Sequence, residues 1–189
     1  MPFDPQSFRS ALQYDGARPN LFQAEMTWPT FMAGDLAGES EKFTYMCRAA
    51  SIPEQTVAEI PVAYQGRQIK VAGNRTFANW IVTIINDEDF SLRDKFERWN
   101  NYLNDHLTNE RDYFAVNSNE YGADARIVHL GKDGYPIRSY RFIGLWPTLV
   151  SDIALAWDSN DTLETFDVTF AYQWWEPEEN LPPPSHARA

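Results

Sequence analysis

The densest group of side chains that could do chemistry is Asp87-Glu88-Asp89. Three neighbouring carboxylates are able to hold a metal ion or to act as general acid and base. They stand directly before a segment with helical periodicity, where the helix dipole stabilises acidic side chains by roughly 0.3–1 kcal/mol. Neither a histidine nor a second acidic cluster is spaced to complete a site. We therefore interpret these carboxylates as helix-terminal residues.

The run Asp158-Ser159-Asn160-Asp161 resembles the first positions of a calcium-binding loop. It lacks the glycine at the sixth position of such a loop, and strand-like segments flank it where a calcium loop has helices. Asp, Asn and Ser side chains bond their own backbone in turns. The run therefore predicts the turn of a β-hairpin between segments 149–157 and 163–174.

The remaining reactive residue types are isolated. Cys47 is the single cysteine, which excludes an internal disulfide framework, and the histidines at positions 106, 129 and 186 are scattered. Cys47 lies in a predicted strand and is interpreted as a buried, inert thiol. The sequence contains no phosphate-binding glycine loop, nucleophile elbow or paired-cysteine motif. We predict no catalytic residues, no cofactor and no metal site, and hence no enzyme.

Charge and hydropathy exclude some locations and some partners for the protein. Acidic residues outnumber basic residues by 27 to 16, giving a net charge of −11, which is unsuited to gripping a phosphate backbone. No stretch approaches the roughly 18 apolar residues of a membrane span. The segment from Met1 to Gln13 lacks the features of a signal peptide. We expect a protein of a soluble compartment with no membrane contact.

Most of the chain alternates apolar and polar residues, as strands with one buried face do. In the clearest case, Phe166, Val168 and Phe170 share one face while Thr165 and Asp167 share the other. The other strands are predicted at residues 22–28, 43–50, 76–85, 125–130 and 136–145. The segment 76–85 carries apolar residues on both faces and so needs cover on both.

Two segments stand out from this pattern. Residues 56–64 and 67–72 flank Gln65-Gly66, which predicts a tight hairpin, and Pro61 places its first arm at an edge or projecting from the domain. The other is a helix predicted over 92–103. Its N-cap is predicted at Ser91, with Asp94 completing a short capping box. Its apolar stripe, predicted to pack on the sheet, consists of Leu92, Phe96, Trp99 and Leu103.

The length of 189 residues fits one domain, which we assign to residues 1–175. Residues 176–189 contain Pro177 and Pro182-Pro183-Pro184 and are predicted to form an extended, proline-rich tail. The residues alone thus predict a mainly β (α+β), antiparallel domain with one helix and a long projecting hairpin. These features favour assembly over catalysis.

Several short motifs follow one another in an order and spacing that resemble the tail tube proteins of contractile-tailed, T4-like bacteriophages. The motifs are Arg18-Pro19-Asn20-Leu21-Phe22, Cys47-Arg48-Ala49-Ala50-Ser51-Ile52-Pro53, Asn74-Arg75-Thr76-Phe77, Trp146-Pro147-Thr148, Trp157-Asp158-Ser159-Asn160 and Glu164-Thr165-Phe166-Asp167-Val168-Thr169-Phe170. Together they span about three quarters of the chain. Each motif alone is weak, and their succession carries the resemblance.

The resemblance implies a β-sandwich or barrel with one flanking helix, in subunits that close into hexameric rings around a lumen. In that family the long hairpin contacts the adjacent ring. The hairpin residues assigned here to ring stacking are Glu59, Ile60, Val62, Tyr64, Arg67, Ile69 and Lys70. The implied partners are further copies of the chain, the tail sheath, the baseplate and the tail terminator. DNA would pass without specific binding, and the protein would belong to the virion tail, assembled in the host cytoplasm.

Two finer hypotheses accompany the resemblance. The net charge of −11 suggests an acidic or neutral lumen to which genome phosphates do not adhere. Residues 107–121 and those beyond 176 exceed what the simplest tube subunit needs, and they are predicted on the outer or sheath-facing surface.

Three alternatives remain open at this stage. Within the same fold, the chain could form a tube-initiating baseplate ring or the tube of a phage-like secretion or injection machine. From another class, an aromatic-rich barrel could enclose a small apolar ligand, and it would then be monomeric and gain thermal stability with that ligand. A hydrolase using the carboxylates of residues 87–89 would lose turnover, but not assembly, when these are changed to Asn.

Overall fold

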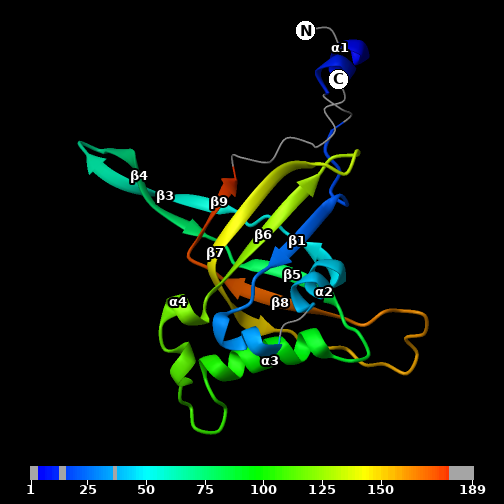
Figure 1. Cartoon of the computed structure of the whole chain (residues 1–189). Coiled ribbons are helices and arrows are strands. Elements are labelled where there is room, and N and C mark those ends of the chain that lie inside the picture. The colour runs from blue at the N-terminus through cyan, green and yellow to red at the C-terminus, as the bar shows by residue number, and fades with distance from the viewer. Residues whose placement is uncertain (1–3, 13–15, 36–37, 179–189) are drawn as a thin grey trace, which may run out of the picture.

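The computed structural model describes residues 4–12, 16–35 and 38–178 (Figure 1). The elements in chain order are α1 (Pro5–Ala11), β1 (Phe22–Met26), η2 (Thr30–Asp35), α2 (Glu39–Met46), β2 (Cys47–Ala50), β3 (Gln55–Tyr64), β4 (Arg67–Phe77), β5 (Trp80–Ile85), α3 (Ser91–Leu103), η3 (Tyr113–Ala115), α4 (Ser118–Tyr121), β6 (Ala123–Leu130), β7 (Pro136–Val150), β8 (Thr165–Ala171) and β9 (Trp174–Glu178). One seven-stranded sheet has the order β1-β6-β7-β8-β5-β2, with β9 also paired to β7. Strands β3 and β4 form a separate two-stranded sheet. The mainly β, antiparallel prediction is confirmed.

Strand β7 connects two layers of the fold. Its first half pairs with β6 and β9, and its second half pairs with β8. Between the halves lies Gly144, whose φ of 63° is a conformation that residues with a Cβ rarely adopt. In Figure 1 the strands β1, β6 and β7 cross over β5 and β8, as in sandwiches whose corners are formed by bent strands. The result is a sandwich, and no ladder between β1 and β2 closes it into a barrel within the described residues.

Large aromatic side chains fill the space between the two layers. Trp80 of β5 stacks on Phe142 of β7, with ring centroids 4.7 Å apart and an interplanar angle of 12°. Trp80 also packs against Phe170 of β8 at 5.4 Å. Alternate residues of β5 and β8 are buried in this layer, namely Trp80, Val82, Ile84, Phe166, Val168 and Phe170. The face predicted from the alternation in the last strand is therefore the core face.

Helix α3 closes one end of the sandwich (Figure 1). Phe96 and Trp99 are completely buried, Leu92 is buried, and Leu103 packs partly buried against the core. The ring of Phe96 contacts aromatic rings of β8, of α2 and of the segment that follows β1. The indole N–H of Trp99 donates a hydrogen bond to the carbonyl of Tyr121 at 3.0 Å.

The start of α3 differs from the prediction in one respect. The helix begins at Ser91, and its N-cap is Phe90 in a left-handed conformation with φ 53°, without a side-chain cap. Asp89 replaces the predicted Ser91 cap, because its carboxylate accepts a hydrogen bond from the Ser91 backbone N–H at 3.0 Å. The capping oxygen thus comes from the acidic run that precedes the helix.

The strand predicted over residues 43–50 is half wrong, because α2 occupies its first part. A strand would place Phe43 and Tyr45 on the same face, yet Phe43 is buried while Tyr45 is largely exposed. Acidic residues in the first turn, Glu39 and Glu41, favour the helix through its dipole.

The strands predicted at 136–145, 149–157 and 163–174 are divided differently in the structure. Strand β7 continues through Pro147 to Val150, with a register shift beside the proline. The chain then forms a loop over 151–164, and the final strand is split into β8 and β9. Strand β9 extends the sheet three residues past the predicted domain end at 175. The rest of the predicted tail, 179–189, lies outside the described residues.

Candidate assembly surfaces

The β3–β4 hairpin projects away from the sandwich (Figure 1). Its two-residue turn, Gln65-Gly66, has positive φ at both positions, 44° and 80°, which matches the twist of paired strands. At its base, Phe77 packs against Tyr172 and Trp175. The hydroxyl of Tyr172 donates to the carbonyl of Ala78 at 2.6 Å. The hairpin is therefore anchored at its base and open along its length.

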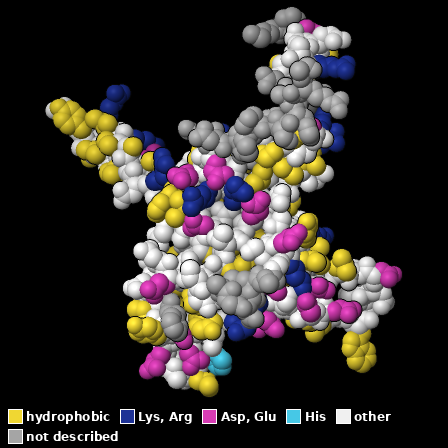
Figure 2. Space-filling model, in the orientation of Figure 1, with side chains coloured by type: hydrophobic (Ala, Val, Ile, Leu, Met, Phe, Trp, Pro, Cys, Tyr) yellow, Lys and Arg dark blue, Asp and Glu magenta, His cyan; other side chains and the backbone are white. Residues whose placement is uncertain are grey.

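The two faces of this hairpin have different chemistry. Cross-strand partners point to the same face, so the ladder pairs Ile60 with Val71 and Val62 with Ile69. The apolar face consists of Ile60, Val62, Tyr64, Ile69 and Val71, with Arg67 beside Tyr64 at the tip, whereas Val57 and its partner Arg75 share the face of Glu59. About half of each of these apolar side chains is exposed to solvent. Figure 2 shows hydrophobic side chains along the projecting hairpin.

The opposite face of the hairpin is polar. Glu59 and Lys70 lie on it and form an ion pair with a distance of 2.8 Å between Nζ and Oε2. Of the residues assigned to ring stacking from the sequence, Ile60, Val62, Tyr64, Arg67 and Ile69 thus share the apolar face, whereas Glu59 and Lys70 do not. A contact through the apolar face would leave this ion pair on the solvent side.

An isolated two-stranded hairpin is marginally stable in water, and contiguous exposed apolar surface is typical of interaction sites. Here every residue of β3 is exposed. The apolar face is thus the strongest candidate for a contact surface in the described chain.

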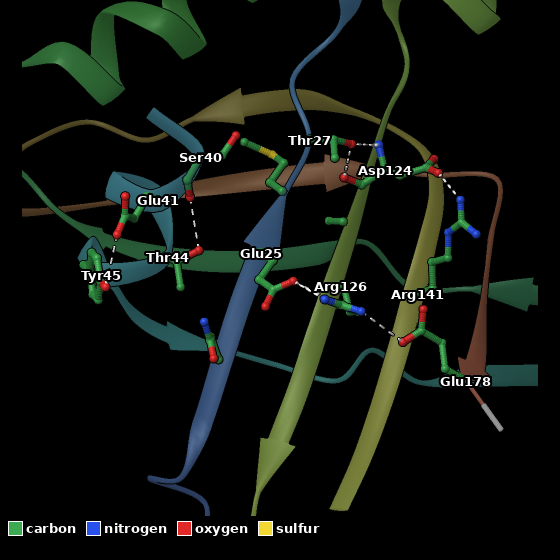
Figure 3. Close-up of a pocket in the computed structure, with 13 residues that line it drawn as sticks. Glu25, Thr27, Ser40, Glu41, Thr44, Tyr45, Asp124, Arg126, Arg141 and Glu178 are labelled. Atoms are coloured by element: carbon green, nitrogen blue, oxygen red, sulfur yellow. Dashed lines mark hydrogen bonds and ion pairs between the residues drawn. The ribbon is translucent and has the colours of Figure 1, made fainter. Parts of the chain in front are cut away.

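A row of charges crosses the outer face of the layer formed by β1, β6, β7 and β9 (Figure 3). The ladder places Glu25, Arg126, Arg141 and Glu176 opposite one another on these strands. Arg126 binds Glu25 through Nη2 and Oε2 at 2.5 Å, and Arg141 binds Asp124 through Nη2 and Oδ2 at 2.6 Å. The hydrogen bonds that the two guanidinium groups donate to these carboxylates raise the pKa of both arginines.

The same face also contains Glu178, whose carboxylate lies 3.7 Å from Arg126 and accepts a hydrogen bond from buried Ser139 at 2.6 Å. Four carboxylates therefore surround two guanidinium groups. The sequence analysis missed this row because Glu25, Arg126 and Arg141 each look like ordinary polar-face residues. Only the strand register brings them together.

The acidic run at residues 87–89 has a structural role in joining two helices. Lys42 of α2 lies 2.6 Å from Asp89 and 3.3 Å from Asp87, and it also donates to the Ser91 hydroxyl at 2.7 Å. The hydrogen bond from Lys42 lowers the pKa of Asp89, and the same bond raises the pKa of Lys42. The carboxylates thus link α2 to the beginning of α3.

The remaining reactive side chains among the described residues do not form a site. Burial raises the pKa of the Cys47 thiol to about 12, so the thiolate that would react is disfavoured. Within the described residues, no group of three or more His, Cys, Asp or Glu side chains is arranged to hold a metal ion. The described helices include none that is long and apolar enough to span a membrane.

Comparison with known proteins settles the family. A sequence model of the family described as phage tail tube protein matches residues 17–178. The chain is 36% identical over 163 residues to the tail tube protein gp19 of Enterobacteria phage T4, which covers 86% of this chain and 92% of that protein. The chain belongs to the phage tail tube protein family. This tail tube protein is also 23% identical to a tail tube protein of Serratia phage KSP90, over 87% of this chain and 92% of that one.

Solved structures share the fold at much lower identity. A chain of the anti-feeding prophage baseplate superposes with a TM-score of 0.62 at 11% identity, covering 86% of this chain and 95% of that chain. A chain of an extracellular contractile injection system, in a sheath–tube complex, gives 0.60 at 13% identity and covers 93% and 99%. The sandwich with a flanking helix is thus a fold also found in contractile injection machines.

Proposed function

We propose that this tail tube protein closes into hexameric rings that stack into the inner tube of a contractile phage tail. The observation that carries this proposal is the uncovered apolar face of the β3–β4 hairpin in a member of this family. An exposed apolar surface of this kind lowers the solubility of a protein unless a partner covers it. Further copies of the chain supply such partners in a repeating assembly.

The edges of the sheet support the same assembly. Within the described residues, β1 and β2 each pair on one side, which leaves their outer edges with unpaired backbone groups. Edges of this kind invite pairing with another chain unless they are blocked or covered. Joining these edges between neighbouring subunits would produce the continuous wall that a conduit requires.

The charge distribution fits a conduit through which DNA passes without adhering. The net charge is −11, and the two arginines of the row in Figure 3 are engaged by carboxylates. Guanidinium groups that are already paired make a poor phosphate-binding surface. We infer that the wall of the lumen is acidic or neutral.

The further partners of the tube would be the sheath, the baseplate and the tail terminator. The injection-system chain that shares this fold comes from a sheath–tube complex, and a further similar chain comes from a sheath/tube terminator assembly. The protein would accordingly be a structural part of the virion tail, with no catalytic role, and it would assemble in the host cytoplasm. A small-ligand barrel is disfavoured because aromatic rings occupy the space that a ligand would need.

The test is negative-stain electron microscopy of concentrated protein combined with gel filtration, with and without phage baseplates as nuclei. We expect hollow rings or tubes with a central channel. Protein that stays monomeric at every concentration, even with baseplates present, would contradict the proposal. Rings that appear in few copies and never extend would instead favour a tube initiator.

A further inference from the structure

A second exposed segment, the loop of residues 151–164 between β7 and β8, extends from the sandwich on the side opposite the hairpin (Figure 1). Its side chains include Trp157, which is fully exposed, and Leu155 and Leu163, which are 84% and 74% exposed. Surface tryptophans are enriched in the energetically important centres of protein interfaces. The loop therefore presents apolar groups that the sandwich does not cover.

The loop is fixed at both of its ends. The Ser151 backbone N–H donates to the carbonyl of Asp167 at 2.8 Å, and the Ser151 hydroxyl accepts from the Asp167 N–H at 2.9 Å. At the other end, the side-chain amide of Asn86 donates to the carboxylate of Glu164. The loop is thus anchored to the body of the domain at both ends, which lowers the entropy cost of ordering it in a contact.

The loop and the hairpin carry opposite charges. The loop contains four acidic residues and no basic residue, namely Asp152, Asp158, Asp161 and Glu164. The hairpin, residues 55–77, contains three basic residues and one acidic residue in a protein whose net charge is −11. One of these basic residues, Arg67, stands on the apolar face at the tip of the hairpin. Each surface therefore combines apolar groups with charges that the other surface complements.

The two surfaces lie on opposite sides of the sandwich in Figure 1, so they cannot meet within one molecule. We propose that the apolar face of the hairpin of one copy docks on the 151–164 loop of a second copy. Trp157 would lie against the Val62–Ile69 pair, and Asp158 and Asp161 would face Arg67. Such a contact joins different surfaces of identical chains and therefore repeats into a ring or a filament.

This inference rests on the proposed tube and names the surface that receives the hairpin. The test reverses the charges on each side, with Arg67→Glu on the hairpin and Asp158→Lys and Asp161→Lys on the loop. All three side chains are exposed, so the variants should melt like the native protein. We expect each one-sided variant to raise the concentration needed for tube formation at least about tenfold, since like charges at a contact weaken it by 1.4 kcal/mol per factor of ten.

The chain that carries all three substitutions should recover tube formation, because its charges are complementary again. Assembly is measured by sedimentation and electron microscopy. A loop variant that assembles like the native protein, or a combined variant no better than the one-sided variants, would overturn the contact. Neither result would affect the proposed tube itself, which stands on the assembly of the native protein.

A disulfide test does not depend on tube formation. The variants Tyr64→Cys and Trp157→Cys are mixed and oxidised, and a covalent dimer is expected in the mixture and in neither protein alone. The native Cys47 is partly buried with a raised pKa and reacts poorly. A mixture that yields no more dimer than the separate variants would contradict the pairing.

Discussion

At the scale of single residues, the charge row shows how register creates a surface that the sequence does not announce. Glu25 lies on β1, which is distant in sequence from the consecutive strands β6 and β7 that carry Arg126 and Arg141, and the ladder aligns the three residues on one face. Each guanidinium has a carboxylate within 2.6 Å. The arginines therefore contribute to the sheet surface as ion pairs rather than as isolated cations.

This pairing predicts how the protein treats DNA. Replacing Glu25 and Asp124 by Gln and Asn should remove the hydrogen-bonded carboxylate of each guanidinium group and produce measurable binding of duplex DNA at low salt, which falls as salt rises. Native protein should show none in the same electrophoretic mobility assay. The control Glu88→Gln with Glu110→Gln makes the same change in net charge at exposed positions and should not bind DNA. Equal binding by both variants would show that net charge, and not the pairing, decides.

At the scale of elements, α3 illustrates what the sequence predicts well. Its apolar stripe at helical spacing indicated both the helix and its buried face, and Phe96 and Trp99 are completely buried. Hydrophobic periodicity succeeded here because one face packs on the core over the whole helix. The hairpin was also predicted from a local signal, namely its turn residues.

Elements whose boundaries depend on distant contacts were predicted less well. Helix α2 was missed because the contact of Phe43 with Phe96 that favours the helix is not visible in the sequence. The continuous strand β7 was divided at Pro147, whose position at a register shift removes the usual conflict between proline and a ladder. The hairpin residues were assigned together, yet only the register showed that Glu59 and Lys70 face away from the others.

The packing of α3 predicts a graded loss of stability. Phe96→Ala should reduce the free energy of unfolding by roughly 3–5 kcal/mol, because it removes a fully buried ring and leaves a cavity. Leu103→Ala removes a partly buried side chain from the end of the same stripe and should cost less than half as much. Urea denaturation followed by tryptophan fluorescence measures both. Equal losses at the two positions would contradict the described burial.

At the scale of the whole molecule, folding and assembly use separate surfaces. The core lies between the two crossed layers and beneath α3, whereas the hairpin forms its own two-stranded sheet outside that core. Changes on the hairpin should therefore alter assembly without altering the stability of the subunit.

The two faces of the hairpin supply a matched experiment. Val62→Ser with Ile69→Ser changes one cross-strand pair on the apolar face, and Ala63→Ser with Gln68→Ser changes the adjacent pair on the polar face. The first variant should fold with an unchanged melting temperature but fail to form tubes, because it removes apolar contacts that a neighbouring copy would cover. The second should fold and assemble like the native protein.

Circular dichroism reports the fold of these variants, and electron microscopy reports the tubes. Tubes from the first variant would mean that assembly does not use the apolar face, and loss of tubes in both would point to the stiffness of the hairpin rather than to one of its faces.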